Sequence, residues 1–214
     1  MNNHPVRYLV LWLTTACNLR CQYCYRQTEA PMAMSRDVVQ AALSLAAASG
    51  LPFHVQLAGG EPTLQPELIE FIGSTVREKQ WPATLAIQTN GTLIDHALIN
   101  LCRRYDIAMG VSLDGPPDVQ ELLRGDSGNT FRGLAILEQE AVPFRVTAVL
   151  SSVNVGRLHD LALTLARYFH IRGVGLAPVV LTGKGRSAAT LLPSETAIHD
   201  GIRSMYDAME WINS

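Results

Sequence analysis

The sequence predicts an α/β protein built as an incomplete, open-sided (β/α)6 TIM-like barrel. Apolar, β-rich runs alternate with helical patterns along the 214 residues, and this alternation indicates right-handed β–α–β crossovers and a parallel sheet. Six such units fall short of the eight that close the common barrel. A doubly wound sheet shares the alternation, and in both architectures functional side chains are expected at the carboxyl ends of the strands.

The expected strands are runs of apolar and β-branched residues, each bounded by turn residues. This composition is typical of strands buried in a parallel sheet. They span residues 8–14, 53–59, 84–90, 107–115, 144–152 and 173–180.

The segments between these runs follow a helical pattern. Ser35 is a good N-cap and Gly50 a good stop for the first helix, and Pro66 stands where proline is tolerated at a helix start. Ser194 and Glu195 begin the last helix. Helices are expected at residues 35–50, 65–80, 95–105, 130–140, 156–170 and from 194 to the C-terminus.

Length, composition and charge narrow the class of protein. We expect a core domain over residues 1–192 and a C-terminal helix at 193–214 that packs on it. With 48% hydrophobic residues, 17% charged residues and a formal net charge of −2, nothing indicates nucleic-acid or membrane binding. The apolar run at 8–13 is too short for a signal peptide or a membrane span. We therefore expect a cytoplasmic protein with reduced cysteines.

Polar or glycine-rich stretches follow five of the six expected strands. A cysteine-containing loop follows the first, and the next four end in "GGEPT", "QTNG", "SLDGP" and "SSVN". Because the carboxyl ends of parallel strands lie at one edge of a sheet or barrel, these loops are expected to converge on one functional face.

Three cysteines in the first loop form a potential metal site. Thiolates spaced as Cys17, Cys21 and Cys24 can surround one soft metal centre. A [4Fe–4S] cluster normally takes four thiolates, so three would leave one iron open to a small molecule. A structural zinc module, or an iron–sulfur electron-transfer protein, would each need a fourth ligand. Cys102 lies in an apolar helical pattern and is expected to be a core residue.

The segment "CNLRCQYC" resembles the CxxxCxxC signature of the radical SAM enzymes, and "GGEP" after the next strand strengthens this resemblance. The resemblance implies that Cys17, Cys21 and Cys24 bind three irons of a [4Fe–4S] cluster. It implies that the fourth iron binds the amino and carboxylate groups of S-adenosylmethionine (SAM). Reductive cleavage of SAM would then give a 5′-deoxyadenosyl radical that abstracts hydrogen from a substrate.

The same resemblance implies further cofactor contacts. Tyr23 would cover the adenine, unless it is only a packing aromatic, and the stretch at 59–61 would bind the methionyl amino group. "SLDG" would contact the ribose or carboxylate, although Asn-Gly and Asp-Gly pairs are also ordinary turns. The candidate residues are Tyr23, Gly59, Gly60, Glu61, Thr89, Asn90, Ser112, Asp114, Ser151 and Asn154. Arg124 and Asp126 are candidates for substrate contact, but a position in a surface loop is the expectation.

The "SLDG" stretch and the Gly- and Arg-containing stretch at 178–186 resemble the peptide-modifying branch of the family. Members of that branch continue into a cysteine-rich SPASM extension, which this sequence lacks. We therefore expect a substrate that is a peptide or another biosynthetic precursor, including a small molecule. We also expect a flavodoxin- or ferredoxin-like reductant, and a partner protein that covers the open side of the barrel. The alternatives are a truncated maturase that depends on such a partner, and an iron–sulfur protein without radical chemistry.

Overall fold

The computed structural model describes residues 4–26, 30–181 and 189–214. These residues form two compact units. Unit 1 contains the described residues within 4–18, 30–89 and 94–110, and unit 2 contains those within 19–26, 90–93, 111–181 and 189–214.

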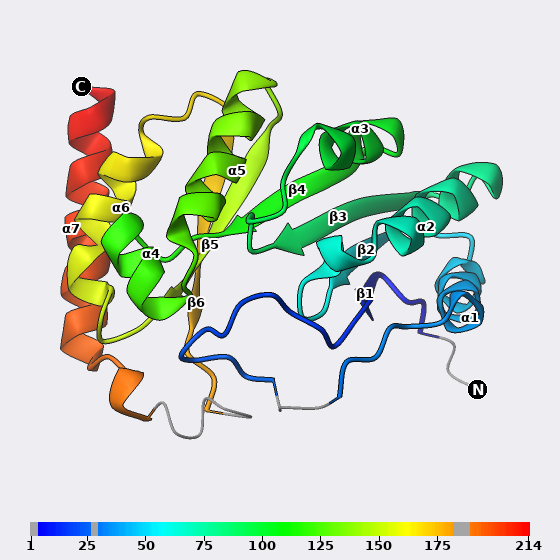
Figure 1. Ribbon diagram of the computed structural model, residues 1–214, viewed down its shortest axis with the longest axis horizontal. Coiled ribbons are helices and arrows are strands. Elements are labelled where there is room, and N and C mark those ends of the chain that lie inside the picture. Colours follow the sequence, from blue (N-terminus) through cyan, green and yellow to red (C-terminus); the bar gives the residue numbers. More distant parts are fainter. Residues whose placement is uncertain (1–3, 27–29, 182–188) are drawn as a thin grey trace. The chain divides into compact units, whose positions relative to one another are not determined.

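Unit 1 is built on three parallel strands and the helices that connect them (Figure 1). Strand β2 pairs with both of its sequence neighbours, so that His54 lies opposite Tyr8 on one side and Thr84 on the other. The elements in chain order are β1 (Tyr8–Trp12), α1 (Arg36–Ala47), β2 (Phe53–Ala58), the 3-10 helix η1 (Pro62–Leu64), α2 (Pro66–Glu78), β3 (Ala83–Thr89) and α3 (His96–Arg104).

Unit 2 contains the second half of the chain and the cysteine-bearing residues 19–26. Its elements are α4 (Pro117–Leu123), α5 (Ser127–Gln139), β5 (Phe144–Leu150), the 3-10 helix η2 (Val155–Arg157), α6 (Leu158–Leu165), β6 (Ile171–Pro178) and α7 (Glu195–Asn213). Strands β5 and β6 are parallel. Strand β4 (Ile107–Ser112) contributes residues to both units.

The strand order is β1-β2-β3-β4-β5-β6. The first and last strands are not neighbours in this order, so the sheet is open. This topology confirms the predicted parallel α/β fold with six strands. Alternate residues of each inner strand are buried, as in Val55 and Leu57 of β2, which is the pattern of strands with one face packed against helices.

Several predicted helix starts are confirmed by their caps. The side chains of Ser35 and Ser194 accept hydrogen bonds from the backbone N–H groups of Val38 and Ala197, which satisfies donors that have no partner within the helix. Asp95 caps α3 in the same way.

Helix α4 was not predicted, and α5 begins three residues earlier than expected. A seven-residue helix is too short for a periodic pattern to stand out. Gly125 and Asp126 adopt left-handed backbone angles (φ 81° and 51°) and separate the two helices. At the other end of unit 2, β6 begins at Ile171, two residues earlier than predicted. Residues 182–188 of the stretch at 178–186 lie outside the described residues.

The C-terminal helix α7 packs on α6 and η2 within unit 2 (Figure 1). Met205 and Ala208 are buried, and at Gly201 the helix meets the carbonyl oxygen of Val155. The division into 1–192 and 193–214 as separate parts stays a prediction. Among the described residues, no helix is both long and apolar enough to cross a bilayer.

Replacing Gly201 by Ala should destabilise unit 2, because the added Cβ would overlap the carbonyl oxygen of Val155. We expect Gly201→Ala to lower the free energy of unfolding by about 1–3 kcal/mol, measured by urea denaturation. Gly128→Ala in α5 is the matched control, because a Cβ there meets no atom within 4 Å. Equal urea midpoints for the two variants would contradict this packing.

Candidate functional site

The turn after β2 lies against the chain segment that leads to Cys17. A Cβ on Gly59 would stand 2.5 Å from the carbonyl oxygen of Thr14, and Gly59 has a φ of 139°, so this close approach requires glycine. The backbone N–H of Gly60 donates to Thr14 O (2.8 Å), and that of Glu61 to Ala16 O (2.8 Å). Backbone hydrogen bonds therefore join the "GGE" turn to the residues just before Cys17 in unit 1.

The carboxylate of Glu61 is buried in unit 1, with only 1% of the residue exposed. Its Oε1 accepts hydrogen bonds from the N–H of Thr63 (3.1 Å) and from the hydroxyls of Thr63 and Thr89 (both 2.7 Å). The structure thus brings together Glu61 and Thr89, two residues predicted from different strand ends. These hydrogen bonds fix the carboxylate and partly offset the cost of burying it.

The segment before Cys17 is also held from the other side. Thr15 N–H donates to the carbonyl oxygen of Met32 (2.8 Å), and Met34 N–H donates to that of Leu13 (2.8 Å). Cys17 itself is exposed. The chain entering the cysteine loop therefore has a fixed path, and the thiol at its end is accessible.

In unit 2, Tyr23 lies between Cys21 and Cys24 and is buried, with 7% exposed. Its ring belongs to an apolar cluster with Leu123 of α4, and Cys21 packs against this cluster. The N–H of Cys24 donates to the carbonyl oxygen of Cys21 (3.2 Å), which closes a turn. Both thiols of this turn are half-buried.

The Tyr23 hydroxyl donates to the carboxylate of Asp114, which has no exposed surface. Arg124 also pairs with this carboxylate, through Nε to Oδ2 (2.8 Å) and Nη2 to Oδ1 (3.1 Å), and the N–H of Val149 donates to Oδ1 (2.9 Å). The side chain of Arg124 is 9% exposed. The expectation that Arg124 lies in a surface loop is wrong, because a buried carboxylate at the end of β4 draws its guanidinium inward.

This environment keeps Tyr23 and Arg124 in their ordinary ionic states. Burial, and then the carboxylate of Asp114, raise the pKa of Tyr23 although Arg124 opposes them, so the phenol stays protonated and can donate. Burial alone would lower the pKa of Arg124, but the Asp114 carboxylate raises it above its ordinary value. The guanidinium therefore stays charged.

Gln120 of α4 also holds the end of β4, and it was not predicted. It is fully buried; its Oε1 accepts from the N–H of Asp114 (2.9 Å), and its Nε2 donates to the carbonyl oxygen of Ser112 (3.3 Å). Gln120 and Arg124 were missed because α4 was missed. The Pro116-Pro117 pair, with proline at N1, is the signal in the sequence that indicates a helix start there.

Ser151 and Asn154 form one buried group in unit 2. The Oδ1 of Asn154 accepts from the N–H (2.7 Å) and the hydroxyl (3.0 Å) of Ser151. Its Nδ2 donates to the carbonyl oxygens of Asp114 (2.9 Å) and Val149 (2.8 Å). This amide therefore ties the end of β5 to the end of β4.

Asn90 stabilises a turn in unit 2. Its Oδ1 accepts from the N–H (3.0 Å) and hydroxyl (2.8 Å) of Thr92, and its carbonyl oxygen accepts from the hydroxyl of Thr130 (3.2 Å). Direct cofactor contacts by the ten candidate residues stay predictions. Hydrogen bonds and, at Gly59, a close backbone approach show that these residues also organise the fold of each unit.

The cysteines suit a soft metal by their chemistry, since none forms a disulfide. Within the described residues, no three His, Cys, Asp or Glu side chains are grouped as around a metal ion, so the three-thiol ligand set stays a prediction. Cys102 is buried, as predicted, and burial raises the pKa of its thiol to about 12.

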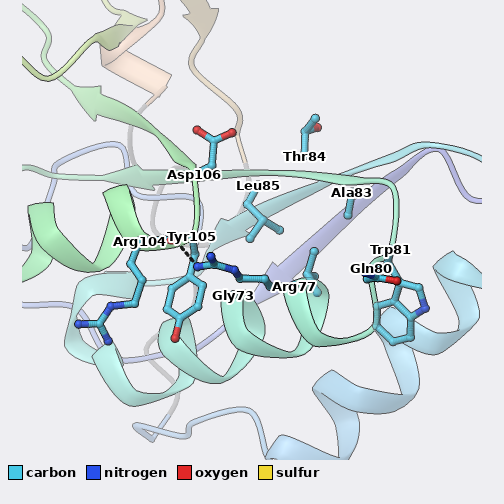
Figure 2. A pocket seen from close by; sticks show the side chains of 11 residues that line it. Gly73, Arg77, Gln80, Trp81, Ala83, Thr84, Leu85, Arg104, Tyr105 and Asp106 are labelled. Carbon is cyan, nitrogen blue, oxygen red and sulfur yellow. Dashed lines mark hydrogen bonds between the residues drawn. The ribbon is translucent and has the colours of Figure 1, made fainter.

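A pocket of about 450 Å³ lies elsewhere in unit 1 (Figure 2). It is lined by residues at the beginning of β3 and just before β4, among them Trp81, Ala83 and Asp106, and by Arg77 of α2 and Arg104 of α3. These are the amino-terminal ends of the strands, and none of the predicted site residues lines the pocket.

Comparison with known proteins gives one family. Residues 13–163 match the Radical SAM superfamily. The Fe-coproporphyrin III synthase of Methanosarcina barkeri is 32% identical over 155 residues, which are 69% of this chain and 38% of that protein. The GTP 3′,8-cyclase of Microcystis aeruginosa is 28% identical over 191 residues, 82% of this chain and 58% of that protein.

A solved structure shows the same fold. Native anSMEcpe with bound AdoMet and Kp18Cys peptide superposes with a TM-score of 0.84 at 19% identity, over 98% of this chain and 62% of that one. The chain therefore spans roughly two fifths to three fifths of the length of these three relatives.

Thiol labelling of the metal-free protein tests the environment of the cysteines. The thiolate is the nucleophile, and a folded-state pKa of about 12 keeps the Cys102 thiol protonated at pH 8. We expect iodoacetamide to modify Cys17, Cys21 and Cys24 at pH 8, and Cys102 only after unfolding, as read by mass spectrometry. Equally rapid labelling of all four would contradict the buried position of Cys102.

The raised pKa of Cys102 also makes the free energy of unfolding depend on pH. The contribution of the protonated thiol to stability is fully present below pH 9 and is lost as the pH rises from 9 toward 12.

Proposed function

Because the chain belongs to the radical SAM superfamily, we propose that it is an enzyme domain that uses a [4Fe–4S] cluster and SAM to abstract hydrogen from a peptide or another biosynthetic precursor. The observation that carries this proposal is the attachment of the "GGE" turn to the chain entering the cysteine loop. Gly60 and Glu61 donate to the backbone of Thr14 and Ala16, so the "GGE" turn is held against the residues that lead to Cys17.

Cys17, Cys21 and Cys24 would hold the cluster, which leaves one iron without a protein ligand. When bound, the cluster and SAM supply a 5′-deoxyadenosyl radical, which removes a hydrogen atom from the substrate. Members of this superfamily use these two cofactors. Thiols stay available for such a cluster in a reducing compartment, so the proposal includes a cytoplasmic location.

The residues of the chain orient the cofactors and shield them from water. In unit 1, the backbone of Gly59 to Glu61 is proposed to receive the methionyl group of SAM, with Glu61 fixed by two threonines. In unit 2, the buried ring of Tyr23 is proposed to offer an apolar surface to the adenine. In each unit, hydrogen bonds hold these side chains in place, and such preorganisation lowers the cost of ordering on binding.

A peptide substrate is favoured by the "SLDG" stretch, because this stretch resembles the peptide-modifying branch of the family. The two relatives described above are named as a synthase of Fe-coproporphyrin III and as a cyclase of GTP, so a small precursor is the second candidate. The proposal also includes a flavodoxin- or ferredoxin-like reductant and a partner protein over the open side of the sheet.

Anaerobic reconstitution tests the proposed chemistry. After loading with iron and sulfide, the protein should form 5′-deoxyadenosine from SAM when dithionite is added, as measured by liquid chromatography. We expect Cys21→Ala to lose both the cluster and the product. Cys102→Ala is the matched control, because it removes a buried thiol that is not part of the loop, and should retain both.

An intact cluster in the unaltered protein without 5′-deoxyadenosine would refute radical chemistry and favour an electron-transfer protein.

The substrate class is tested by adding candidate precursors together with a partner protein. If a partner completes the site, SAM cleavage should rise at least about tenfold only when precursor and partner are both present. Rapid SAM cleavage with a free small molecule and no partner would contradict the partner proposal.

A further inference from the structure

We propose that the C-terminal end of α4 is a clamp that positions the Cys21–Cys24 turn, with Arg124 as its central positioning residue. The clamp is defined as Leu122, Leu123 and Arg124. That the turn carries a cluster rests on the proposed function; the clamp itself rests on contacts within unit 2.

The clamp contacts Gln22 and Tyr23, which are the two residues between Cys21 and Cys24. The carbonyl oxygens of Leu122 and Leu123 accept from Nε2 (2.6 Å) and the backbone N–H (2.9 Å) of Gln22. Arg124 lies over the ring of Tyr23, with 5.3 Å between its guanidinium carbon and the ring centroid. The last carbonyls of a helix have no partner within the helix, so this helix end is free to hold another segment.

Asp114 supports the clamp from the end of β4. A carboxylate has about four lone-pair positions, and here Tyr23, Arg124 (twice) and Val149 each donate to them. A ribose hydroxyl could bind only by displacing one of these donors. The geometry therefore assigns Asp114 to positioning Tyr23 and Arg124, in place of the ribose contact predicted from the sequence.

The guanidinium cannot be replaced freely at this position. Its fixed fork matches the two carboxylate oxygens, which the single ammonium of lysine does not. A neutral side chain would leave a buried carboxylate without its counter-charge, and such groups are strongly destabilising.

Hydrogen exchange on the metal-free protein of 214 residues tests the clamp without requiring a cluster. In Arg124→Met, exchange of the Gln22 and Cys24 amides should accelerate at least about tenfold, because their acceptors lose a fixed position. The amide of Phe144, which donates to His170 within unit 2, reports whether the unit as a whole has loosened and should change less. Arg124→Lys should restore part of the protection.

Arg157→Met is the matched control, since its two ion pairs, with Asp118 and Asp160, are exposed. It should leave the exchange of Gln22 and Cys24 unchanged. Tyr23→Phe keeps the aromatic ring and removes the donor to Asp114. It should loosen the same turn even if Arg124→Met does not fold.

The reconstituted protein gives the second readout. The cluster in Arg124→Met should have a more negative reduction potential than in the unaltered protein, because the positive charge over the ring of Tyr23 is removed. Unchanged exchange in both Arg124→Met and Tyr23→Phe would overturn the clamp. If exchange responds as expected but the unaltered protein binds no cluster, the clamp stands and the proposed function fails.

Discussion

The carboxylate of Asp114 has no exposed surface, and it constrains the arrangement of unit 2. Burying such a charge is costly unless it is paired and fully hydrogen-bonded. Asp114 is held by groups from four places: the ends of β4 and β5, helix α4 and the Cys21–Cys24 turn. The Cys21–Cys24 turn therefore has its position because the carboxylate needs a donor from Tyr23 and a counter-charge from Arg124.

Unit 1 follows the same principle with a different acid. Glu61 is buried and takes its hydrogen bonds from Thr63 and Thr89, while Gly59 lets the turn approach Thr14. In both units, a strand-end residue that resembles a cofactor contact also organises the surrounding turns. Preorganisation of this kind is what a site needs if its binding energy is to be used for orientation.

The sequence predicted the parallel six-stranded fold and most helix starts, because alternation and caps such as Ser35 and Ser194 are local signals. It also predicted that Thr89 and Glu61 come from converging loops. It did not predict α4, which is too short for a periodic pattern, nor the burial of Arg124, which depends on an acid ten residues away in the chain. Hydrogen-bond partners such as Asn154 with Asp114 are set by tertiary packing, so only their location at strand ends could be foreseen.

SAM is proposed to bind the one iron of the cluster that has no cysteine ligand. Mössbauer spectroscopy of the ⁵⁷Fe-reconstituted protein, recorded with and without SAM, tests this most directly. One iron of the four is expected to change its isomer shift when SAM is added, while the other three, bound by Cys17, Cys21 and Cys24, do not. An isomer shift that stays unchanged for every iron when SAM is added would contradict the claim.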